Sequence, residues 1–136
     1  MKEDKSKLIR EFLKQKVFAV VGASRDPKKY GHQVYINLKR NGYEAYPINP
    51  KTDQILGNKC YPNIASLPKK PDVVDIVVPP KITENIVKEC KELGITRIWM
   101  QPGSESEGAL EFCRKNKMKV LYGICVIMES KKVVEK

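Results

Sequence analysis

The chain has 136 residues, 41% of them hydrophobic, which is enough for one domain with a core but not for two. No apolar run is long enough to span a bilayer, and residues 1–16 lack the apolar stretch of a secretory signal, so we expect a cytoplasmic protein. The net charge of +10 fits a nucleic acid, an anionic membrane, an anionic small molecule or a solvated lysine surface.

The four cysteines are widely spaced, and the chain has a single histidine, His32. The cysteines are Cys60, Cys90, Cys113 and Cys125. They form no C-x-x-C pair, which argues against a structural zinc site and against a secreted disulfide framework. We expect no metal site and free, mostly buried thiols.

The first half of the chain alternates helical and strand patterns. A surface helix is predicted over residues 6–15, followed by a buried strand over 17–21 that ends at Gly22. Residues 31–40 have the pattern of a helix, and 43–48 that of a second strand. A long loop punctuated by prolines follows, with one helical turn expected near residues 64–67.

The second half continues the alternation. Strands are predicted at residues 73–78, 95–100 and 119–122. The clearest helix places Ile82, Ile86, Cys90 and Leu93 on one face and is capped by Gly94. Another helix is expected to begin at a capping box of Ser104 and Glu107 and to end near Asn116, and a final one is expected from Val126 onward.

This alternation predicts an α/β fold, a Rossmann-like, doubly wound parallel sheet of five strands with helices on both faces. Right-handed crossovers favour the strand order 3-2-1-4-5. We expect one domain over residues 1–136, with an N-terminal helix within 1–16 and a tail at 130–136. Ligands of such sheets bind outside the carboxyl ends of the strands, here where the order reverses between the first and fourth strands.

The loop after the first strand suits a phosphate. Gly22 lets the backbone approach a ligand, and the small Ala23 and Ser24 leave room for an anion before the next helix. Arg25, Lys28 and Lys29 add positive charge. The same glycine is also compatible with a tight turn alone. The loop lacks both the G-x-G-x-x-G dinucleotide fingerprint and a Walker A lysine.

The end of the second strand discriminates between nucleotides. NAD-binding domains place an acidic residue there, whereas this chain has Asn49, Pro50 and Lys51. A lysine suits a phosphorylated ribose. This favours the 3′-phosphate of coenzyme A (CoA) over the 2′-phosphate of NADP, although Lys51 is also compatible with an ordinary exposed loop position.

Four segments together resemble the stand-alone CoA-binding domain family, which is similar to the N-terminal domain of the succinyl-CoA synthetase alpha subunit. The segments are residues 17–24 (VFAVVGAS), 46–51 (YPINPK), 75–80 (DIVVPP) and 98–103 (IWMQPG). The resemblance implies that residues 22–25 hold the CoA phosphates, that Lys51 pairs with a phosphate, and that residues 78–80 and 100–102 line the nucleotide and pantetheine. The chain is too short for the second domain of the synthetase, whose histidine is phosphorylated, and His32 is not given that role.

Combining the fold with the resemblance gives a predicted set of cofactor-binding residues. They are Gly22, Ala23, Ser24, Arg25, Lys29, Tyr30, Gly31, Asn49, Pro50, Lys51, Val78, Pro79, Pro80, Met100, Gln101 and Pro102.

No catalytic constellation is visible in the sequence. Asp72 and Asp75 flank a strand, Glu105 and Glu107 cap a helix, and Ser24 has no candidate base except His32. We therefore expect a non-catalytic module that binds CoA or an acyl-CoA and is not an enzyme.

Other interpretations of the function are also compatible with the sequence. The main rival is the NADP-binding domain of a reductase. We expect no specific nucleic-acid partner and no membrane, whereas a homo-oligomer or a protein partner of a CoA-responsive domain is compatible with the sequence. Cys125, which follows the fifth strand, is a candidate for a mixed disulfide with CoA, against the simpler interpretation of an inert thiol.

Overall fold

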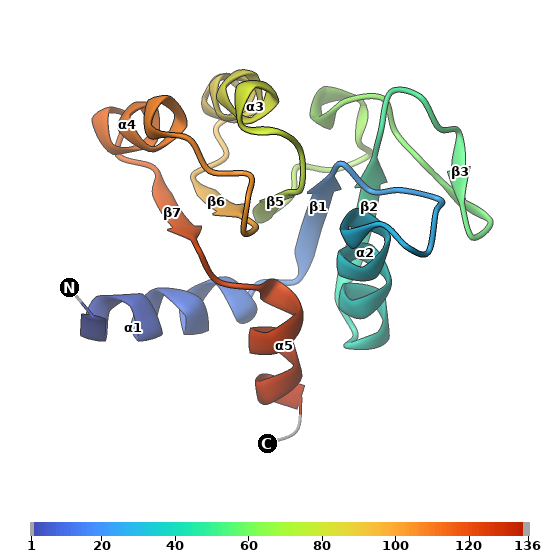
Figure 1. Ribbon diagram of the computed structural model, residues 1–136, viewed down its shortest axis with the longest axis horizontal. Helices are drawn as coiled ribbons and strands as arrows, with labels where there is room; N and C mark the ends of the chain where they lie inside the picture. Colours follow the sequence, from blue (N-terminus) through green and yellow to red (C-terminus); the bar gives the residue numbers. More distant parts are fainter. Residues whose placement is uncertain (1, 135–136) are drawn as a thin grey trace.

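The computed structural model describes residues 2–134, and the side chains of residues 5–130. Its centre is a parallel sheet of five strands (Figure 1). The strands are β1 (Val17–Val21), β2 (Glu44–Ile48), β5 (Val73–Ile76), β6 (Arg97–Met100) and β7 (Lys119–Tyr122). All five predicted strands are confirmed, with β5 ending and β6 beginning two residues inside the predicted limits.

The predicted strand order is wrong. The order is β2-β1-β5-β6-β7, which in chain order is 2-1-3-4-5 and not 3-2-1-4-5. Pro47 gives the physical reason. A strand inside a sheet donates backbone N–H groups to the strands on both of its sides, and proline has no N–H to donate. Pro47 therefore favours an edge position for β2. In β5 all four residues are buried, which suits a central position. The order therefore reverses between β1 and β5.

Helices cover both faces of the sheet, as predicted. Helices α1 (Lys2–Leu13), α2 (Tyr30–Arg40) and α5 (Val126–Val134) lie on one face (Figure 1). The side chains of Phe12, Leu38 and Val126 join them to a common core with Trp99. Helices α3 (Pro80–Glu92) and α4 (Glu107–Lys115) cover the opposite face.

The buried face of α3 matches the predicted one only in part, since Cys90 is buried as predicted. Thr83, Val87 and Cys90 point into the core, whereas Ile82 is 46% exposed and Ile86 is only partly buried. The two isoleucines are one turn apart on a helix flank that meets the crevice described below.

The start of α4 also differs from the prediction. Ser106, and not Ser104, is the N-cap, and its hydroxyl accepts a hydrogen bond from the Ala109 N–H at 3.0 Å. Ser104 is instead buried in a turn, where its N–H donates to the carbonyl of Gln101 at 2.9 Å. Because of this turn, the N-cap of α4 lies two residues later than predicted.

The segment between β2 and β5 contains a hairpin that the sequence analysis missed. Strands β3 (Gln54–Ile55) and β4 (Asn58–Lys59) pair around Leu56 and Gly57, which both have positive φ, as a two-residue hairpin turn requires. The predicted helical turn is confirmed as the short 3-10 helix η1 (Ile64–Ser66). Between them the backbone of Tyr61 pairs with Pro47 and Asn49 on the outer edge of β2, at 2.9 Å in each case.

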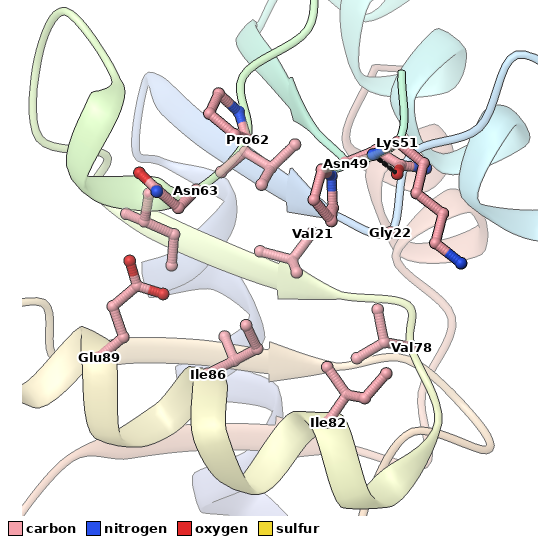
Figure 2. A pocket seen from close by; sticks show the side chains of 13 residues that line it. Val21, Gly22, Asn49, Lys51, Pro62, Asn63, Val78, Ile82, Ile86 and Glu89 are labelled. Atoms are coloured by element: carbon pink, nitrogen blue, oxygen red, sulfur yellow. Dashed lines mark hydrogen bonds between the residues drawn. The ribbon is translucent and has the colours of Figure 1, made fainter. Parts of the chain in front are cut away.

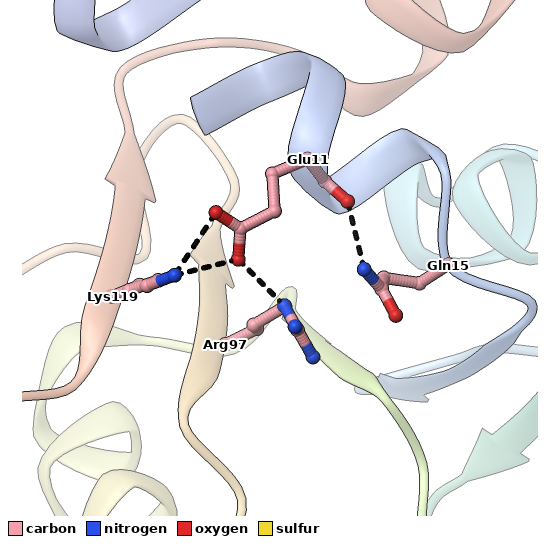
Figure 3. A network of polar contacts seen from close by, with 4 residues as sticks. All are labelled: Glu11, Gln15, Arg97 and Lys119. Carbon is pink, nitrogen blue, oxygen red and sulfur yellow. Dashed lines mark hydrogen bonds and ion pairs between the residues drawn. The ribbon is translucent and has the colours of Figure 1, made fainter. Parts of the chain in front are cut away.

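Helix α1 is held to the amino-terminal ends of β6 and β7 by Glu11 (Figure 3). Its carboxylate accepts hydrogen bonds from Arg97 Nε at 2.9 Å and from Lys119 Nζ at 2.9 Å. These two hydrogen bonds lower the pKa of Glu11. The network lies at the edge of the sheet opposite the crevice.

The expected final helix is present as α5. It extends through most of the expected 130–136 tail, of which residues 135 and 136 lie outside the described residues. Within the described chain, no helix combines the length and apolar character needed to cross a membrane.

Candidate functional site

A crevice of about 360 Å³ opens at the carboxyl ends of β1 and β2, beside the point where the strand order reverses (Figure 2). This volume lies in the range of small-molecule sites, roughly 300–1,000 Å³. The lining residues are Val21, Gly22, Ile48, Asn49, Pro50, Lys51, Pro62, Asn63, Ile64, Val78, Ile82, Ile86 and Glu89.

The crevice is an apolar slot with different polar groups at its two ends. Ile82 and Ile86 of α3 form one wall, and the ends of β1 and β2 face them (Figure 2). Asn63 and Glu89 lie at one end, and Lys51 lies at the other. The crevice therefore offers apolar walls, with an acidic side chain and an amide at one end and an ammonium group at the other.

Asn49 joins the loops after β1 and β2. Its side-chain amide donates to the carbonyl of Ala23 at 2.8 Å, and its side-chain oxygen accepts from the backbone N–H of Lys51 at 2.9 Å. The first bond fixes the glycine loop relative to β2, and the second turns the chain at Lys51. Asn49 therefore acts mainly on the geometry of the crevice.

Gly22 and Gly31 permit a close approach of three chain segments. Gly22 has φ +99°, and a Cβ there would lie 2.1 Å from the carbonyl oxygen of Val77. A Cβ at Gly31 would lie 2.0 Å from the carbonyl oxygen of Gly22. Protein backbone thus fills the space that both glycines leave, and this close packing places the start of α2 against the glycine loop.

The loop 22–29 is ordered by its own polar groups. Ser24 Oγ accepts from the Asp26 N–H at 3.0 Å, and the Ser24 carbonyl lies 2.8 Å from His32 Nδ1. His32 is buried and has this structural contact. The hydroxyl of Ser24 is not paired with His32, so the only candidate nucleophile–base pair of the sequence analysis is not formed.

The start of α2 is suited to an anion. Over its described first turn, residues 30–33, the helix has no acidic residue, and its N-cap Lys29 makes no side-chain capping bond. Arg25, Lys28 and Lys29 are all exposed beside it. Three cations and one acidic residue, Asp26, therefore give this loop a net positive charge beside the backbone N–H groups of the helix start.

Two predicted ligand contacts, Met100 and Gln101, have fully buried side chains. Met100 is part of the core beneath α3 and α4. The side-chain oxygen of Gln101 accepts from Tyr30 Oη at 3.0 Å and from the Val126 N–H at 3.0 Å, and its amide donates to Asp75 at 3.1 Å. Both residues are used by the fold and are not exposed at the sheet edge, and the backbone N–H of Gln101 donates to the carbonyl of Ile76 at 3.0 Å.

Asp75 lies inside β5 and does not flank the strand as expected from the sequence. It is fully buried, and burial raises its pKa well above the ordinary value, against the opposing effect of the Gln101 hydrogen bond. Among the described residues no group bonds its Oδ2 atom.

The predicted residues thus fall into two sets. Gly22, Asn49, Pro50, Lys51 and Val78 line the crevice together. The others lie outside its lining: Ala23, Ser24, Arg25, Lys29, Tyr30, Gly31, Pro79, Pro80, Met100, Gln101 and Pro102.

Sequence reasoning missed a second group of lining residues. Ile82 and Ile86 were assigned to the buried face of α3, and Glu89 lies one turn further along. Pro62 and Asn63 were passed over as loop. Isoleucines at i and i+4 are an ordinary core signal, so nothing local distinguished these two from core residues.

A comparison with models of protein families shows which family the chain belongs to. The model described as "CoA binding domain" matches residues 16–131. The chain belongs to this family. The resemblance found in the sequence is thereby confirmed.

The CoA-binding domain also occurs within larger enzymes. The chain is 40% identical over 103 residues to acetate–CoA ligase [ADP-forming] II of Archaeoglobus fulgidus, covering 74% of the chain but 15% of that ligase. It spans less than a fifth of the length of the acetate–CoA ligase sequences it matches.

Solved structures include both sizes of relative. A conserved hypothetical protein from Pyrococcus furiosus has 41% identity and a TM-score of 0.81, over 84% of this chain and 98% of that one. The dinucleotide-forming acetyl-coenzyme A synthetase 1 of Ca. Korarchaeum cryptofilum has 34% identity and a TM-score of 0.65, over 76% of this chain and 25% of that one. The CoA-binding domain therefore has relatives of its own size as well as relatives that are ligases.

Proposed function

We propose that this chain binds CoA or an acyl-CoA, with its nucleotide in the crevice, and acts as a binding module and not as an enzyme. The observation that carries the proposal is the pairing of an apolar slot with Lys51, at the carboxyl ends of β1 and β2, in a member of the CoA-binding domain family. Ligands of such sheets bind at this place.

The slot fits the adenine ring. Its walls of Ile82, Ile86 and Ile48 offer apolar contact to a flat base. At the end away from Lys51, the carboxylate of Glu89 would accept a hydrogen bond from the exocyclic amine of adenine. The amide oxygen of Asn63, which already accepts from the Ser66 N–H at 2.9 Å, has a second lone pair for the same amine. This assigns adenine to the end away from Lys51.

The cations suit the phosphates of CoA. Lys51 lies at the opposite end of the slot, where it would pair with the 3′-phosphate on the ribose. The diphosphate would then pass over the glycine loop toward the N-terminus of α2, beside Arg25 and Lys29. The net charge of +10 adds a general attraction for this polyanion.

The arrangement of polar side chains supports binding without catalysis. Asp75 and Gln101 are buried and bonded to each other, and His32 faces the Ser24 carbonyl. The part shared with the acetate–CoA ligase of Archaeoglobus fulgidus is 15% of that ligase. The proposed role is to hold CoA for, or report it to, another protein.

Calorimetric titration under reducing conditions tests this function. We expect CoA and acetyl-CoA to bind, NADP not to compete with them, and dephospho-CoA, which lacks the 3′-phosphate, to bind about tenfold more weakly, a difference of roughly 1.4 kcal/mol. Lys51→Glu should weaken the binding of CoA at least as much as the loss of the 3′-phosphate does. Lys88→Glu, the same charge change on the exposed side of α3, is the matched control. Binding of NADP but not of CoA would overturn the proposal.

A further inference from the structure

Cys125 differs from the other three cysteines in its access to solvent. Cys60, Cys90 and Cys113 are buried, whereas Cys125 is partly exposed. Burial raises the pKa of Cys60, Cys90 and Cys113, in the case of Cys113 to about 11. Because it alone of the four thiols is partly exposed, Cys125 is the thiol that a dissolved disulfide can reach.

Cys125 belongs to a cluster of polar side chains. Its Sγ lies 2.6 Å from the hydroxyl of Tyr30, which in turn donates to Gln101 at 3.0 Å. The neighbouring Val126 N–H bonds the same Gln101 oxygen, and the carbonyl of Ile124 accepts from the Trp99 indole at 2.9 Å. The thiol is therefore held in place from both sides.

The proton of Tyr30 can serve either of two acceptors. When Cys125 carries its proton, the phenol donates to Gln101 and the thiol donates to the phenol oxygen. When Cys125 is a thiolate, the phenol can turn its proton to Sγ, while Gln101 keeps the bond from Val126. Burial and the bond to Cys125 raise the pKa of Tyr30, so it retains a proton to donate.

Asp75 is compatible with a nearby thiolate. Its carboxyl group bonds Gln101 and is fully buried, and its raised pKa favours the neutral form. A neutral Asp75 does not repel negative charge on Cys125. Tyr30 and Gln101 thus lie between the neutral Asp75 and the Cys125 sulfur, and the Tyr30 hydroxyl can donate a hydrogen bond to that sulfur.

The cluster lies on the same edge of the sheet as the crevice. Tyr30 begins α2 directly after the glycine loop, and Gln101 directly follows β6. From β1 to β6 is two strand spacings, roughly 10 Å. The pantetheine arm of a CoA whose adenine occupies the slot would run from the glycine loop along this edge, toward Cys125.

We propose that Cys125 undergoes thiol–disulfide exchange with CoA disulfide bound in the crevice, an inference that rests on the proposed CoA function. The Cys125 thiolate attacks one sulfur of CoA–S–S–CoA and forms Cys125–S–S–CoA. The other CoA leaves as a thiolate and takes up the proton that Cys125 lost to solvent. Cys125 is oxidised and the departing CoA sulfur is reduced, so electrons balance.

Intact-mass kinetics on the full chain test this exchange. The protein is first titrated with reduced CoA in the presence of a phosphine, then freed of reductant and incubated with CoA disulfide or, separately, glutathione disulfide. We expect one CoA adduct, removed by dithiothreitol and mapped to the Cys125 peptide. It should form at least about tenfold faster than the glutathione adduct, because binding brings the disulfide to the thiol.

Three variants sharpen the result. Cys125→Ser should form no adduct, whereas Cys113→Ala should form it as the wild type does. Tyr30→Phe, which removes the phenol proton, should slow adduct formation about tenfold when rates are compared at saturating CoA disulfide. Peptide mapping of the wild type gives the same answer if a variant fails to fold.

The outcomes separate the two proposals. If reduced CoA fails to bind, the proposed function itself is wrong. If reduced CoA binds but Cys125 is unmodified, is modified no faster than by glutathione disulfide, or is passed over for another cysteine, the exchange is wrong and the binding function stands.

Discussion

The side-chain amide of Asn49 donates a hydrogen bond to the carbonyl oxygen of Ala23 over 2.8 Å. Asn49 and Ala23 are 26 residues apart in the chain, and this bond connects the loop after β2 to the loop after β1. Because Asn49 also accepts from the N–H of Lys51 at 2.9 Å, one side chain sets the relative position of the glycine loop and the lysine.

Asn49→Ala should therefore weaken CoA binding although Lys51 and the glycine loop keep their identities. Both bonds of the side chain are lost, so the glycine loop and Lys51 are no longer held in one arrangement before CoA binds. We expect a loss of affinity of roughly tenfold, about 1.4 kcal/mol, by calorimetry. Asn116→Ala, which removes a comparable side-chain bond to the Phe112 carbonyl at the end of α4, is the control. Equal CoA affinity in the Asn49 variant and the wild type would show that Asn49 does not position the site.

Gly31→Ala should destabilise the fold strongly. The added Cβ would lie 2.0 Å from the carbonyl oxygen of Gly22, so the backbone must move. We expect a loss of about 2–3 kcal/mol in the free energy of unfolding, measured with urea. Gly108→Ala meets only the flexible side chain of Glu84 and should change stability by less than about 1 kcal/mol. Similar losses in the two variants would contradict the close approach at Gly31.

Glu11→Gln should lower stability at neutral pH by about 0.5–1 kcal/mol, because the ion pairs with Arg97 and Lys119 are partly exposed. The folded state lowers the pKa of Glu11, so its contribution is present above the unfolded value of 4.5. It is lost as the pH falls through the lower folded value. Urea midpoints of variant and wild type should therefore converge in acid, whereas Glu92→Gln, on α3, should follow the wild type throughout.

Asp75→Asn should raise the stability of the protein at neutral and basic pH, whereas Glu11→Gln lowers it. The folded state raises the pKa of Asp75, so wild-type stability is fully present below the unfolded value of 3.8 and declines as the pH rises toward the folded value. The variant, which cannot ionise, should match the wild type near pH 4 and exceed it by about 1 kcal/mol or more at pH 8. Asp72→Asn, whose carboxylate accepts from the Val17 N–H, should show no such gain. A wild type whose stability does not fall with rising pH would contradict a buried, protonated Asp75.

The strands could be predicted from the sequence because each is a short apolar run between turn residues. Their order could not be obtained from the crossover rule alone, since that rule allows the third strand on either side of the pair. The deciding signal was Pro47, which confines β2 to an edge, and it was present in the sequence.

The candidate site was predictable where it depends on strand-ending loops and not where it depends on packing. Lys51 and Gly22 follow strands, so the fold alone places them at the crevice. Ile82 and Ile86 have the spacing of core residues, and only the rotation of α3 in the structure directs them to the crevice. For Gln101 the error was the reverse. As a polar residue after a strand it was predicted to contact the ligand, but its side chain is hydrogen-bonded within the protein.

The central claim is that the nucleotide of CoA occupies the crevice between α3 and the ends of β1 and β2. A crystal structure of the protein grown with CoA tests it most directly. The account predicts an adenine ring between Ile48 and the pair Ile82 and Ile86, with the 3′-phosphate at Lys51. CoA bound elsewhere, or a crevice without nucleotide at saturating CoA, would contradict it.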